Sequence, residues 1–380
     1  MELKDYREQI DGIDNDIVRL FQERMNVAGN IARYKKENGM AVLDKSRERS
    51  KLAELVGKTD EEFKSYTHVL YSLIFELSRS WQGRMINDTT ELQKKIQNAV
   101  DNTQKLFPPR AEVACQGVEG AYSQIACEKL FSIPDIMYFN SFESVFAAID
   151  QGLCSYGVLP LENSTAGSVN KIYDLMSRYD FSIVRSVRLK IDHNLLAKKG
   201  AELGDIREIY SHEQAINQCS EFLKKLDGVK VTVCENTAAA AKMVAESDRN
   251  DIAALSSRSC AELYDLACLA ESVQDKGNNY TRFICISKNL EIYPGADKTS
   301  IMIMTDHKPG ALYKLLSRFY ALGINLTKLE SRPLPDRDFE FMFYFDLETS
   351  VYSPEFITLI GELESSCEQF RYLGSYSEMV

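Results

Sequence analysis

An amide and two hydroxyls follow closely on an apolar run near the middle of the chain. The run YGVLPL, residues 156–161, has the composition of a buried strand. Asn163, Ser164 and Thr165 come next, and Gly167 and a helical pattern follow them. Such groups beside a helix N-terminus can hold a carboxylate, although the same residue types are ordinary helix caps. The stretch therefore predicts either a carboxylate-binding turn or a plain cap.

Three further polar stretches stand where expected strands meet expected helices or loops. They contribute Gly117, Gly120, Tyr122 and Ser123, then Ser211 and His212, and finally Thr281, Arg282 and Phe283. Hydroxyls at the carboxyl ends of strands lie where open α/β sheets bind ligands. A lone histidine is more often structural than catalytic, so no stretch identifies a reaction by itself.

Cationic residues on the first expected helix suggest a different site. Arg24 and Lys35 are eleven residues apart, which places them on one face at roughly 17 Å separation. Their long side chains can bind opposite ends of a small dianion that lies between them. Arg7 lies roughly 25 Å from Arg24 on a straight helix, so it can reach the same ligand only from a second, antiparallel chain.

Other polar residues are spaced so that they lie on one face of a helix. Asp44, Arg47 and Glu48 stand at i, i+3 and i+4, and Ser78 and Gln82 stand at i and i+4. Each of these residues alone is most simply a solvated side chain. Their joint pattern is what points to a site.

The elements that must position these residues fall into four segments. Residues 1–85 are helical throughout, with a break at Gly39, a second helix capped by Asp44 and a third from about 60 to 83. Residues 86–110 are polar and helical and end in FPPR, which indicates a linker.

The two later segments change character. Residues 111–289 alternate short apolar strands with helices, which predicts an α/β domain with a largely parallel sheet. Residues 298–380 read as βαββαβ, the order of a ferredoxin-like α+β domain.

Composition excludes several classes of protein. The net charge of −11 argues against nucleic-acid binding, and there is no apolar run of about 20 residues for a membrane span. Nine cysteines without a C-x-x-C pair and only four histidines argue against a metal site. With no apolar N-terminal signal segment, these observations predict reduced thiols and a cytoplasmic location.

The helical segment resembles the all-helical chorismate mutases, over residues 1–85. The resemblance implies the intertwined dimer of that family, a Claisen rearrangement of chorismate to prephenate, and no cofactor. Arg7 of a partner chain, Arg24 and Arg47 would bind carboxylates, and Ser78 would assist them. Lys35 and Gln82 would face the ether oxygen, and Asp44 and Glu48 would hold the ring hydroxyl.

The α/β segment resembles the prephenate dehydratases, over residues 111–289. That family has two lobes like those of periplasmic binding proteins, and the second lobe would be about 191–268 here. The resemblance implies loss of CO2 and the ring hydroxyl from prephenate, with Thr281 as proton donor assisted by Arg282. Substrate-binding residues would be Tyr122, Ser123, Asn163, Ser164, Thr165, Ser211, His212 and Phe283. Ala121 and Glu213 depart from the family pattern, which often has a hydroxyl and a proline there.

The last segment carries HKPGALYKLL and NLTKLESRP, which contain no arrangement of acid, base or nucleophile. In a βαββαβ frame the pair is similar to the ACT domains of phenylalanine-inhibited dehydratases, over residues 299–376. The implied ligand is L-phenylalanine at a dimer interface. Its binding residues would be Gly310, Ala311, Leu312, Asn325, Glu330 and Ser331.

Together these resemblances predict a bifunctional isomerase and lyase of phenylalanine biosynthesis, as a homodimer or higher homo-oligomer. Two alternatives remain for the middle segment. It could be an arogenate dehydratase, whose substrate carries an amine on its side chain, or a non-catalytic α/β ligand-binding domain. A mutase on the same chain produces prephenate, which favours prephenate as the substrate.

Overall fold

The computed structural model of the protein describes residues 2–40, 43–86, 89–305, 308–333, 341–367 and 369–380. Contacts between residues divide the chain into two units. The first unit consists of Met1–Lys95, Met304–Asn325 and Tyr352–Phe370. The second consists of Ile96–Ile303, Leu326–Val351 and Arg371–Val380.

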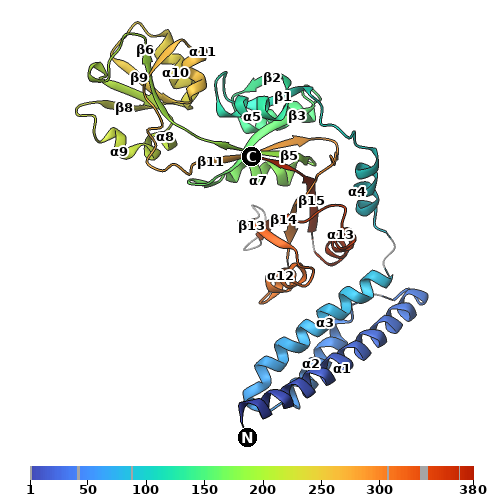
Figure 1. The fold of residues 1–380 in the computed structure, drawn as a ribbon. Coiled ribbons are helices and arrows are strands. Elements are labelled where there is room, and N and C mark those ends of the chain that lie inside the picture. Colours follow the sequence, from blue (N-terminus) through green and yellow to red (C-terminus); the bar gives the residue numbers. More distant parts are fainter. Residues whose placement is uncertain (1, 41–42, 87–88, 306–307, 334–340, 368) are drawn as a thin grey trace. The chain divides into compact units, whose positions relative to one another are not determined.

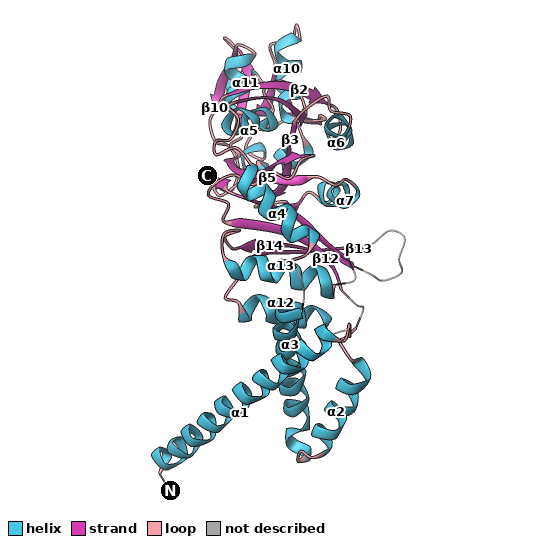
Figure 2. Cartoon of the chain, turned by 90° about the vertical axis from the view of Figure 1, so that its right-hand side faces the viewer, coloured by secondary structure: helices cyan, strands magenta, loops and turns pink. Residues whose placement is uncertain are grey.

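Three helices form the N-terminal part of the first unit: α1 Leu3–Glu37, α2 Lys45–Gly57 and α3 Lys64–Ile86 (Figures 1 and 2). The helical prediction for this segment is confirmed. Ala28, Gly29 and Ala32 are the buried residues of α1. A Cβ atom on Gly29 would lie only 3.2 Å from Trp81 Nε1 of α3, so the small residues let the two helices pack closely.

The boundaries of these helices follow from local chemistry. The carboxylate of Asp44 accepts a hydrogen bond from the Arg47 backbone N–H at 2.9 Å, as the predicted N-cap of α2. Gly39 has φ +61°, which is a left-handed conformation. It lies two residues after Glu37, the last residue of α1, and does not continue the helix. The predicted linker contains a regular helix, α4 Glu91–Asn102, before Pro108 and Pro109.

The first sheet of the second unit has the order β16-β5-β11-β3-β1-β2, with β4 paired to β3. Its strands are β1 Arg110–Gln116, β2 Ile133–Phe139, β3 Tyr156–Asn163, β4 Gly167–Ser168, β5 Ser182–Lys190, β11 Tyr280–Ser287 and β16 Glu378–Met379. The helices of this part are α5 Tyr122–Leu130, α6 Phe142–Asp150 and α7 Asn170–Arg178.

The second sheet has the order β10-β6-β9-β7-β8 (Figure 1). Its strands are β6 Asn194–Lys198, β7 Glu208–Ser211, β8 Lys230–Val233, β9 Ile252–Ser256 and β10 Leu266–Ala270. The helices of this part are α8 Glu213–Gln218, α9 Ser220–Leu223, α10 Thr237–Glu246 and α11 Arg258–Leu263. This sheet occupies the part of the chain that was expected to form the second lobe.

The prediction of a largely parallel sheet is wrong. Strand β1 pairs in parallel with β2 and β3, and β7 with β8 and β9. However, β11 returns from the second sheet and enters between β3 and β5, antiparallel to both. Strand β6 is also antiparallel to its two neighbours. Both sheets are mixed, because the chain crosses between them twice and reverses direction.

The C-terminal segment has the predicted order of strands and helices. A four-stranded sheet of order β13-β14-β12-β15 is built from β12 Lys298–Met304, β13 Asn325–Pro333, β14 Phe341–Glu348 and β15 Gln369–Tyr376. The helices α12 Ala311–Ala321 and α13 Pro354–Ser366 lie between these strands in the sequence. The turn expected at PLPDRD, residues 333–338, lies almost wholly outside the described residues. None of the described helices is long and apolar enough to cross a membrane.

The turn between β1 and α5 packs against α11 of the second sheet. Gly120 has φ +87°, and its carbonyl oxygen accepts hydrogen bonds from Ser257 Oγ and Cys260 Sγ, both at 3.3 Å. A Cβ atom on Gly120 would lie 2.8 Å from Cys260 Sγ. Both the backbone conformation and the close packing therefore disfavour a side chain at this position.

We expect Gly120→Ala to lower the free energy of unfolding by about 2–4 kcal/mol, the sum of left-handed strain and overpacking. Gly152→Ala is the matched control, since Gly152 has φ +74° and a Cβ atom added there would meet nothing within 4 Å. It should cost only about 1–2 kcal/mol. Urea unfolding of both variants measures the difference, and equal losses would contradict the close packing at Cys260.

Candidate active sites

A hydrogen-bonded cluster of amides and hydroxyls joins the ends of β3 and β11. Asn163 is the last residue of β3 and pairs with Thr281 of β11. Its Oδ1 accepts from the backbone N–H groups of Thr165 at 3.0 Å and Ala166 at 2.9 Å, and from Thr165 Oγ1 at 2.7 Å. Its Nδ2 donates to Asn279 Oδ1 at 2.8 Å and to Thr281 Oγ1 at 2.9 Å. The structure thus brings Asn163, Thr165 and Thr281 together.

The second sheet contributes a residue to the same cluster. Gln218, at the end of α8, donates from Nε2 to Thr165 Oγ1 at 2.7 Å. Its Oε1 accepts from Asn279 Nδ2 at 2.9 Å and contacts His193 Nε2 at 2.9 Å. We refer to Asn163, Thr165, His193, Gln218, Asn279 and Thr281 as the amide cluster. Sequence reasoning missed His193, Gln218 and Asn279. Gln218 lies six residues after the predicted His212, and Asn279 lies two residues before the predicted Thr281.

The amide cluster contains no carboxylate and no cationic side chain. Asn163 and Thr281 are buried, and Thr165 is exposed. Amide N–H groups and hydroxyls in such a place can bind an anionic or hydroxylated ligand without a permanent charge nearby. Thr281 Oγ1 accepts from Asn163, so its own proton is available to another partner.

Several expected substrate residues are held by the protein itself. Ser164 Oγ donates to the Asn278 carbonyl at 2.8 Å and accepts from the Tyr280 N–H at 2.9 Å, which pins the turn to the neighbouring loop. The Tyr122 hydroxyl donates to the Asp192 carbonyl at 2.6 Å, and burial raises the pKa of this phenol. Ser123 is buried within α5.

The stretch after β7 has structural partners as well. Ser211 Oγ donates to the Leu255 carbonyl at 2.8 Å, inside the second sheet. His212 caps α8, where its Nδ1 accepts from the Gln214 N–H at 3.2 Å. Phe283 is buried in the core of the first sheet, at 3% exposure. The structure does not bring these three residues into the amide cluster.

Arg282 points away from Thr281. Neighbouring residues of a strand face opposite sides of a sheet, and Arg282 pairs with Glu162 while Thr281 pairs with Asn163. The guanidinium is 5% exposed and forms ion pairs with Glu162 at 2.7 Å and with Asp346 of β14 at 2.5 Å. The expected assistance of Arg282 in proton transfer therefore has no geometric support.

Strand β13 adds polar contacts on the Arg282 side. Lys328 forms an ion pair with Glu162, and Ser168 Oγ donates to Glu330 Oε2 at 2.6 Å. Burial alone would raise the pKa of Glu162, but the charges of Arg282 and Lys328 outweigh it and hold this pKa below its usual range. The residues flanking Asn163–Thr165 are thereby tied to β13 and β14.

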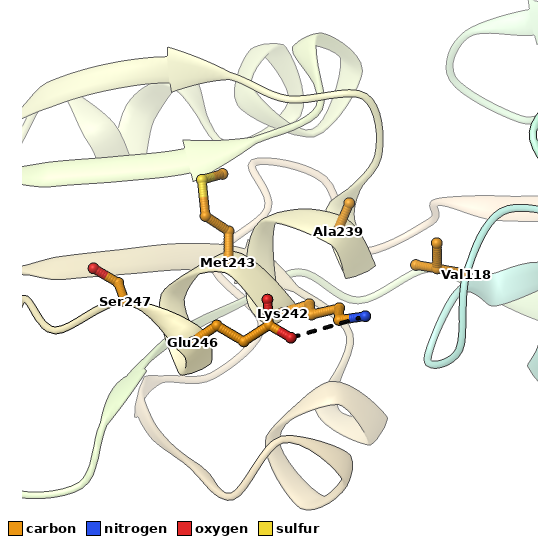
Figure 3. Close-up of a pocket in the computed structure, with 6 residues that line it drawn as sticks. All are labelled: Val118, Ala239, Lys242, Met243, Glu246 and Ser247. Atoms are coloured by element: carbon orange, nitrogen blue, oxygen red, sulfur yellow. Dashed lines mark ion pairs between the residues drawn. The ribbon is translucent and has the colours of Figure 1, made fainter.

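An open pocket of about 350 Å³ lies elsewhere, along α10 (Figure 3). Val118 and the α10 residues Ala239, Lys242, Met243 and Glu246 line it together with Ser247. Lys242 and Glu246 form an exposed ion pair at 3.8 Å across one helical turn. No residue of the amide cluster lines this pocket. Among the described residues, no group of three or more His, Cys, Asp or Glu side chains is placed to hold a metal ion.

The N-terminal helices assemble a second candidate site in the first unit. Arg24 of α1 donates to Ser78 Oγ of α3 and lies 5.5 Å from the centre of the Phe75 ring. Burial lowers the pKa of Arg24. Gln82 is buried one turn after Ser78, and its Oε1 has no hydrogen-bond partner among the described residues. A cation and an unsatisfied amide on adjoining helix faces mark a place for a polar ligand.

An ion-pair chain connects α2 with α3 and α12. Glu48 of α2 is paired with Arg79, and Arg79 is also paired with Glu76. Glu76 Oε1 accepts from Arg318 Nε of α12 at 2.8 Å. Glu76 is 4% exposed, so its charge is held by the two arginines. Burial raises the pKa of Glu76, but Arg318 and Arg79 lower it by more.

The other expected residues of this segment have simpler positions. Asp44 caps α2, and the side chains of Arg7 and Arg47 are exposed. Lys35 is partly buried near the end of α1. A single chain therefore brings Arg24, Ser78 and Gln82 together.

Comparisons with known proteins identify the families of the helical segment and of the α/β segment. The chorismate mutase type II family model matches residues 6–83, and the prephenate dehydratase family model matches residues 113–291. A bifunctional chorismate mutase/prephenate dehydratase from Buchnera aphidicola is 31% identical over 98% of this chain and 95% of its own. The chain belongs to this bifunctional family. It is an enzyme with a chorismate mutase domain and a prephenate dehydratase domain.

Two further relatives each match over 70% of this chain. Arogenate dehydratase/prephenate dehydratase 2 from Arabidopsis thaliana is 39% identical over 70% of this chain and 73% of its own. The prephenate dehydratase of Arthrobacter aurescens, solved in complex with L-Phe, is 27% identical with a TM-score of 0.64. It covers 70% of this chain and 89% of its own.

The residues expected to bind an effector fall in both units. In the first unit, Gly310 has φ +82° and precedes α12, and Ala311 and Leu312 form its first turn. Asn325, the first residue of β13, also belongs to the first unit. In the second unit, Glu330 accepts from Ser168, and Ser331 is exposed on β13.

The lowered pKa of Glu162 predicts a specific dependence of stability on pH. A depressed carboxyl pKa stabilises the fold above the ordinary glutamate value of about 4.3, and this contribution is lost as pH falls through the folded-state value. We expect Glu162→Gln to lower the free energy of unfolding by about 1–3 kcal/mol at pH 7.

The difference between the original chain and Glu162→Gln should shrink as the pH falls below about 4.3, because Glu162 of the unfolded chain then takes up a proton more readily than Glu162 of the folded protein. Urea unfolding at a series of pH values measures this difference. A difference that stayed constant down to pH 3 would contradict the ion pairs with Arg282 and Lys328.

Proposed function

We propose that the chain converts chorismate to prephenate in its helical domain and prephenate to phenylpyruvate, CO2 and water in its α/β domain. The observation that carries the second step is the direction of the hydrogen bond at Thr281. Asn163 Nδ2 donates to Thr281 Oγ1, so the threonine proton can be donated to the substrate.

The chemistry of this second step is a decarboxylation coupled to loss of hydroxide. The bond from the ring to its carboxylate breaks, and its electron pair becomes a ring double bond while the C–O bond to the hydroxyl breaks. Thr281 donates its proton to the departing hydroxide, which leaves as water, and the threonine oxygen regains a proton from solvent. Aromatisation of the ring supplies the driving force. The Thr165 hydroxyl and the Gln218 side-chain amide then serve to bind the substrate.

The first step is a pericyclic rearrangement and needs no nucleophile. Arg24 with Ser78 is suited to a substrate carboxylate, and Gln82 would donate from its amide N–H group to the ether oxygen on which charge develops. Lys35 would act beside Gln82, and Glu48 with Asp44 would hold the ring hydroxyl. Arg47 and Arg7 would bind carboxylates, the latter from a second chain. The protein's work is to hold a reactive conformer and stabilise its charge.

The surface of α1 supports a homodimer. Ile10, Ile13, Ile17, Leu20 and Val27 form an apolar stripe that is more than half exposed in the single chain. Such a stripe marks a protein–protein interface. An antiparallel partner helix would cover it and would bring Arg7 toward the Arg24 of the other chain.

We also propose a regulatory ACT domain over residues 299–376. The order β13-β14-β12-β15 is the strand order of a ferredoxin-like sheet, which supports this assignment. Gly310, Ala311, Leu312, Asn325, Glu330 and Ser331 would bind L-phenylalanine and thereby inhibit the dehydratase. A cytoplasmic location fits the nine free cysteines.

Arogenate is the second candidate substrate of the α/β domain. The Arabidopsis relative, named as an arogenate dehydratase/prephenate dehydratase, favours this candidate. A comparison of kcat/KM for prephenate and arogenate distinguishes the two. The presence of a mutase domain on the same chain favours prephenate, and turnover of neither compound would leave a domain that only binds ligands.

We expect Thr281→Ala to lower kcat for prephenate by about 100-fold or more, the usual contribution of a positioned proton donor. Thr281→Ser is the matched control, because it keeps the hydroxyl, and it should retain most of the activity. The assay supplies chorismate and follows prephenate and phenylpyruvate separately, with and without L-phenylalanine. Phenylpyruvate should fall with phenylalanine, and prephenate should accumulate in the alanine variant. Equal activity of the two variants would remove Thr281 from the mechanism.

The dimer proposal predicts complementation between two inactive variants. Arg7→Ala and Arg24→Ala should each lose mutase activity almost completely. In co-refolded or co-expressed mixtures, each mixed dimer has one intact site, which restores about a quarter of the original activity at random pairing. Size-exclusion chromatography controls for assembly. No recovery in mixed dimers would show that Arg7 acts within its own chain or not at all.

A further inference from the structure

His193 is a buried imidazole between the two sheets of the dehydratase domain, and no role above depends on it. It stands between β5 and β6, where the chain first crosses to the second sheet, and is 3% exposed. Its backbone N–H donates to Gln274 Oε1 at 2.9 Å, and its carbonyl accepts from the Val273 N–H at 2.8 Å. Its ring contacts Gln218 through Nε2, while Nδ1 has no hydrogen-bond partner among the described residues.

The donor and acceptor roles in the amide cluster are determined by the backbone N–H groups that contact Asn163. Backbone N–H groups can only donate, and those of Thr165 and Ala166 both point at one side-chain atom of Asn163. That atom must therefore be the amide oxygen, which leaves the Asn163 nitrogen to face Asn279. Asn279 must turn its own oxygen toward this nitrogen. Its nitrogen then donates to Gln218.

The same reasoning assigns the remaining two contacts. The Gln218 atom that receives a hydrogen bond from Asn279 is its oxygen, so its nitrogen faces Thr165. His193 Nε2 contacts this oxygen and must therefore carry the hydrogen. The imidazole is neutral, since burial lowers the pKa of His193, and its Nδ1 lone pair is the unpartnered position. The tautomer follows from the cluster and needs no assumption about the amide orientations.

We propose that His193 is a positioning residue that sets the polarity of the Gln218 amide in the dehydratase site. With Asn279, its Nε2–H holds the Gln218 oxygen away from the substrate side and leaves the NH2 group for Thr165. The second hydrogen of that NH2 group remains for an anionic ligand. A reversed amide would present oxygen lone pairs to the carboxylates of the substrate. This inference rests on the proposed dehydratase function.

The matched pair of variants is His193→Gln and His193→Phe. Glutamine can place an N–H donor close to the Nε2 position, whereas phenylalanine fills the space without a donor. We expect His193→Phe to lower kcat/KM for prephenate by about 10- to 100-fold, the effect of one hydrogen bond to a charged group. Most of the loss should be in KM, because a donor to a carboxylate binds substrate and transition state alike. His193→Gln should keep most of the activity.

Two controls separate positioning from folding. Chorismate mutase activity of the same chains should stay unchanged in both variants. Gln218→Ala removes the group through which His193 acts, so adding His193→Phe to it should cause little further loss. A full additional loss in the double variant, or equal losses in His193→Phe and His193→Gln, would overturn the proposal.

The tautomer provides a test that does not depend on turnover. The chain has four histidines, so 15N-histidine NMR of the original protein can be assigned by the signal that disappears in His193→Gln. We expect the protonated nitrogen of His193 to be Nε2. An Nδ1–H tautomer or a doubly protonated ring would overturn the inference even if prephenate is turned over. If prephenate is not turned over but the Nε2–H tautomer is found, the proposed function fails and the assigned hydrogen bonds remain.

Discussion

The oxygen of the Asn163 amide is the fixed point of the dehydratase site, because two backbone N–H groups donate to it. A buried polar group that is held in this way cannot turn over without leaving donors unpaired. The orientation of each further amide follows from its neighbour, through Asn279 and Gln218 to the ring of His193. The site therefore obtains a definite pattern of donors without any charged residue.

Strand β11 serves two purposes because its side chains alternate. Thr281 faces the amide cluster, while the next residue, Arg282, faces Glu162 and Asp346. An arginine that is almost fully buried needs anionic partners, and here one comes from β3 and the other from β14. The chemistry of the site and its attachment to the C-terminal sheet thus depend on adjacent residues of one strand.

Sequence patterns predicted local structure better than they predicted which strands pair and in which direction. The N-cap at Asp44 and the helices of residues 1–85 depend on residues that are close in the sequence, and both could be predicted directly. The antiparallel insertion of β11 could not, since it depends on where a distant segment returns. Ser211 and His212 looked like site residues because hydroxyl and imidazole groups at helix starts suit both ligands and caps. Gln218 and His193 carry no spacing motif, and only the fold brings them to Asn163.

The contact of Arg318 with Glu76 affects how far the chain can be divided. Glu76 is buried on α3 between Arg79 and Arg318, and Arg79 is the partner of Glu48. A fragment that ends after α3 would keep every expected mutase residue but would lose Arg318. Glu76 would then form an ion pair with Arg79 alone. Arg79, which also pairs with Glu48, would be the one cation left for both carboxylates. The ion pairs of the N-terminal helices thus include a residue more than two hundred positions away.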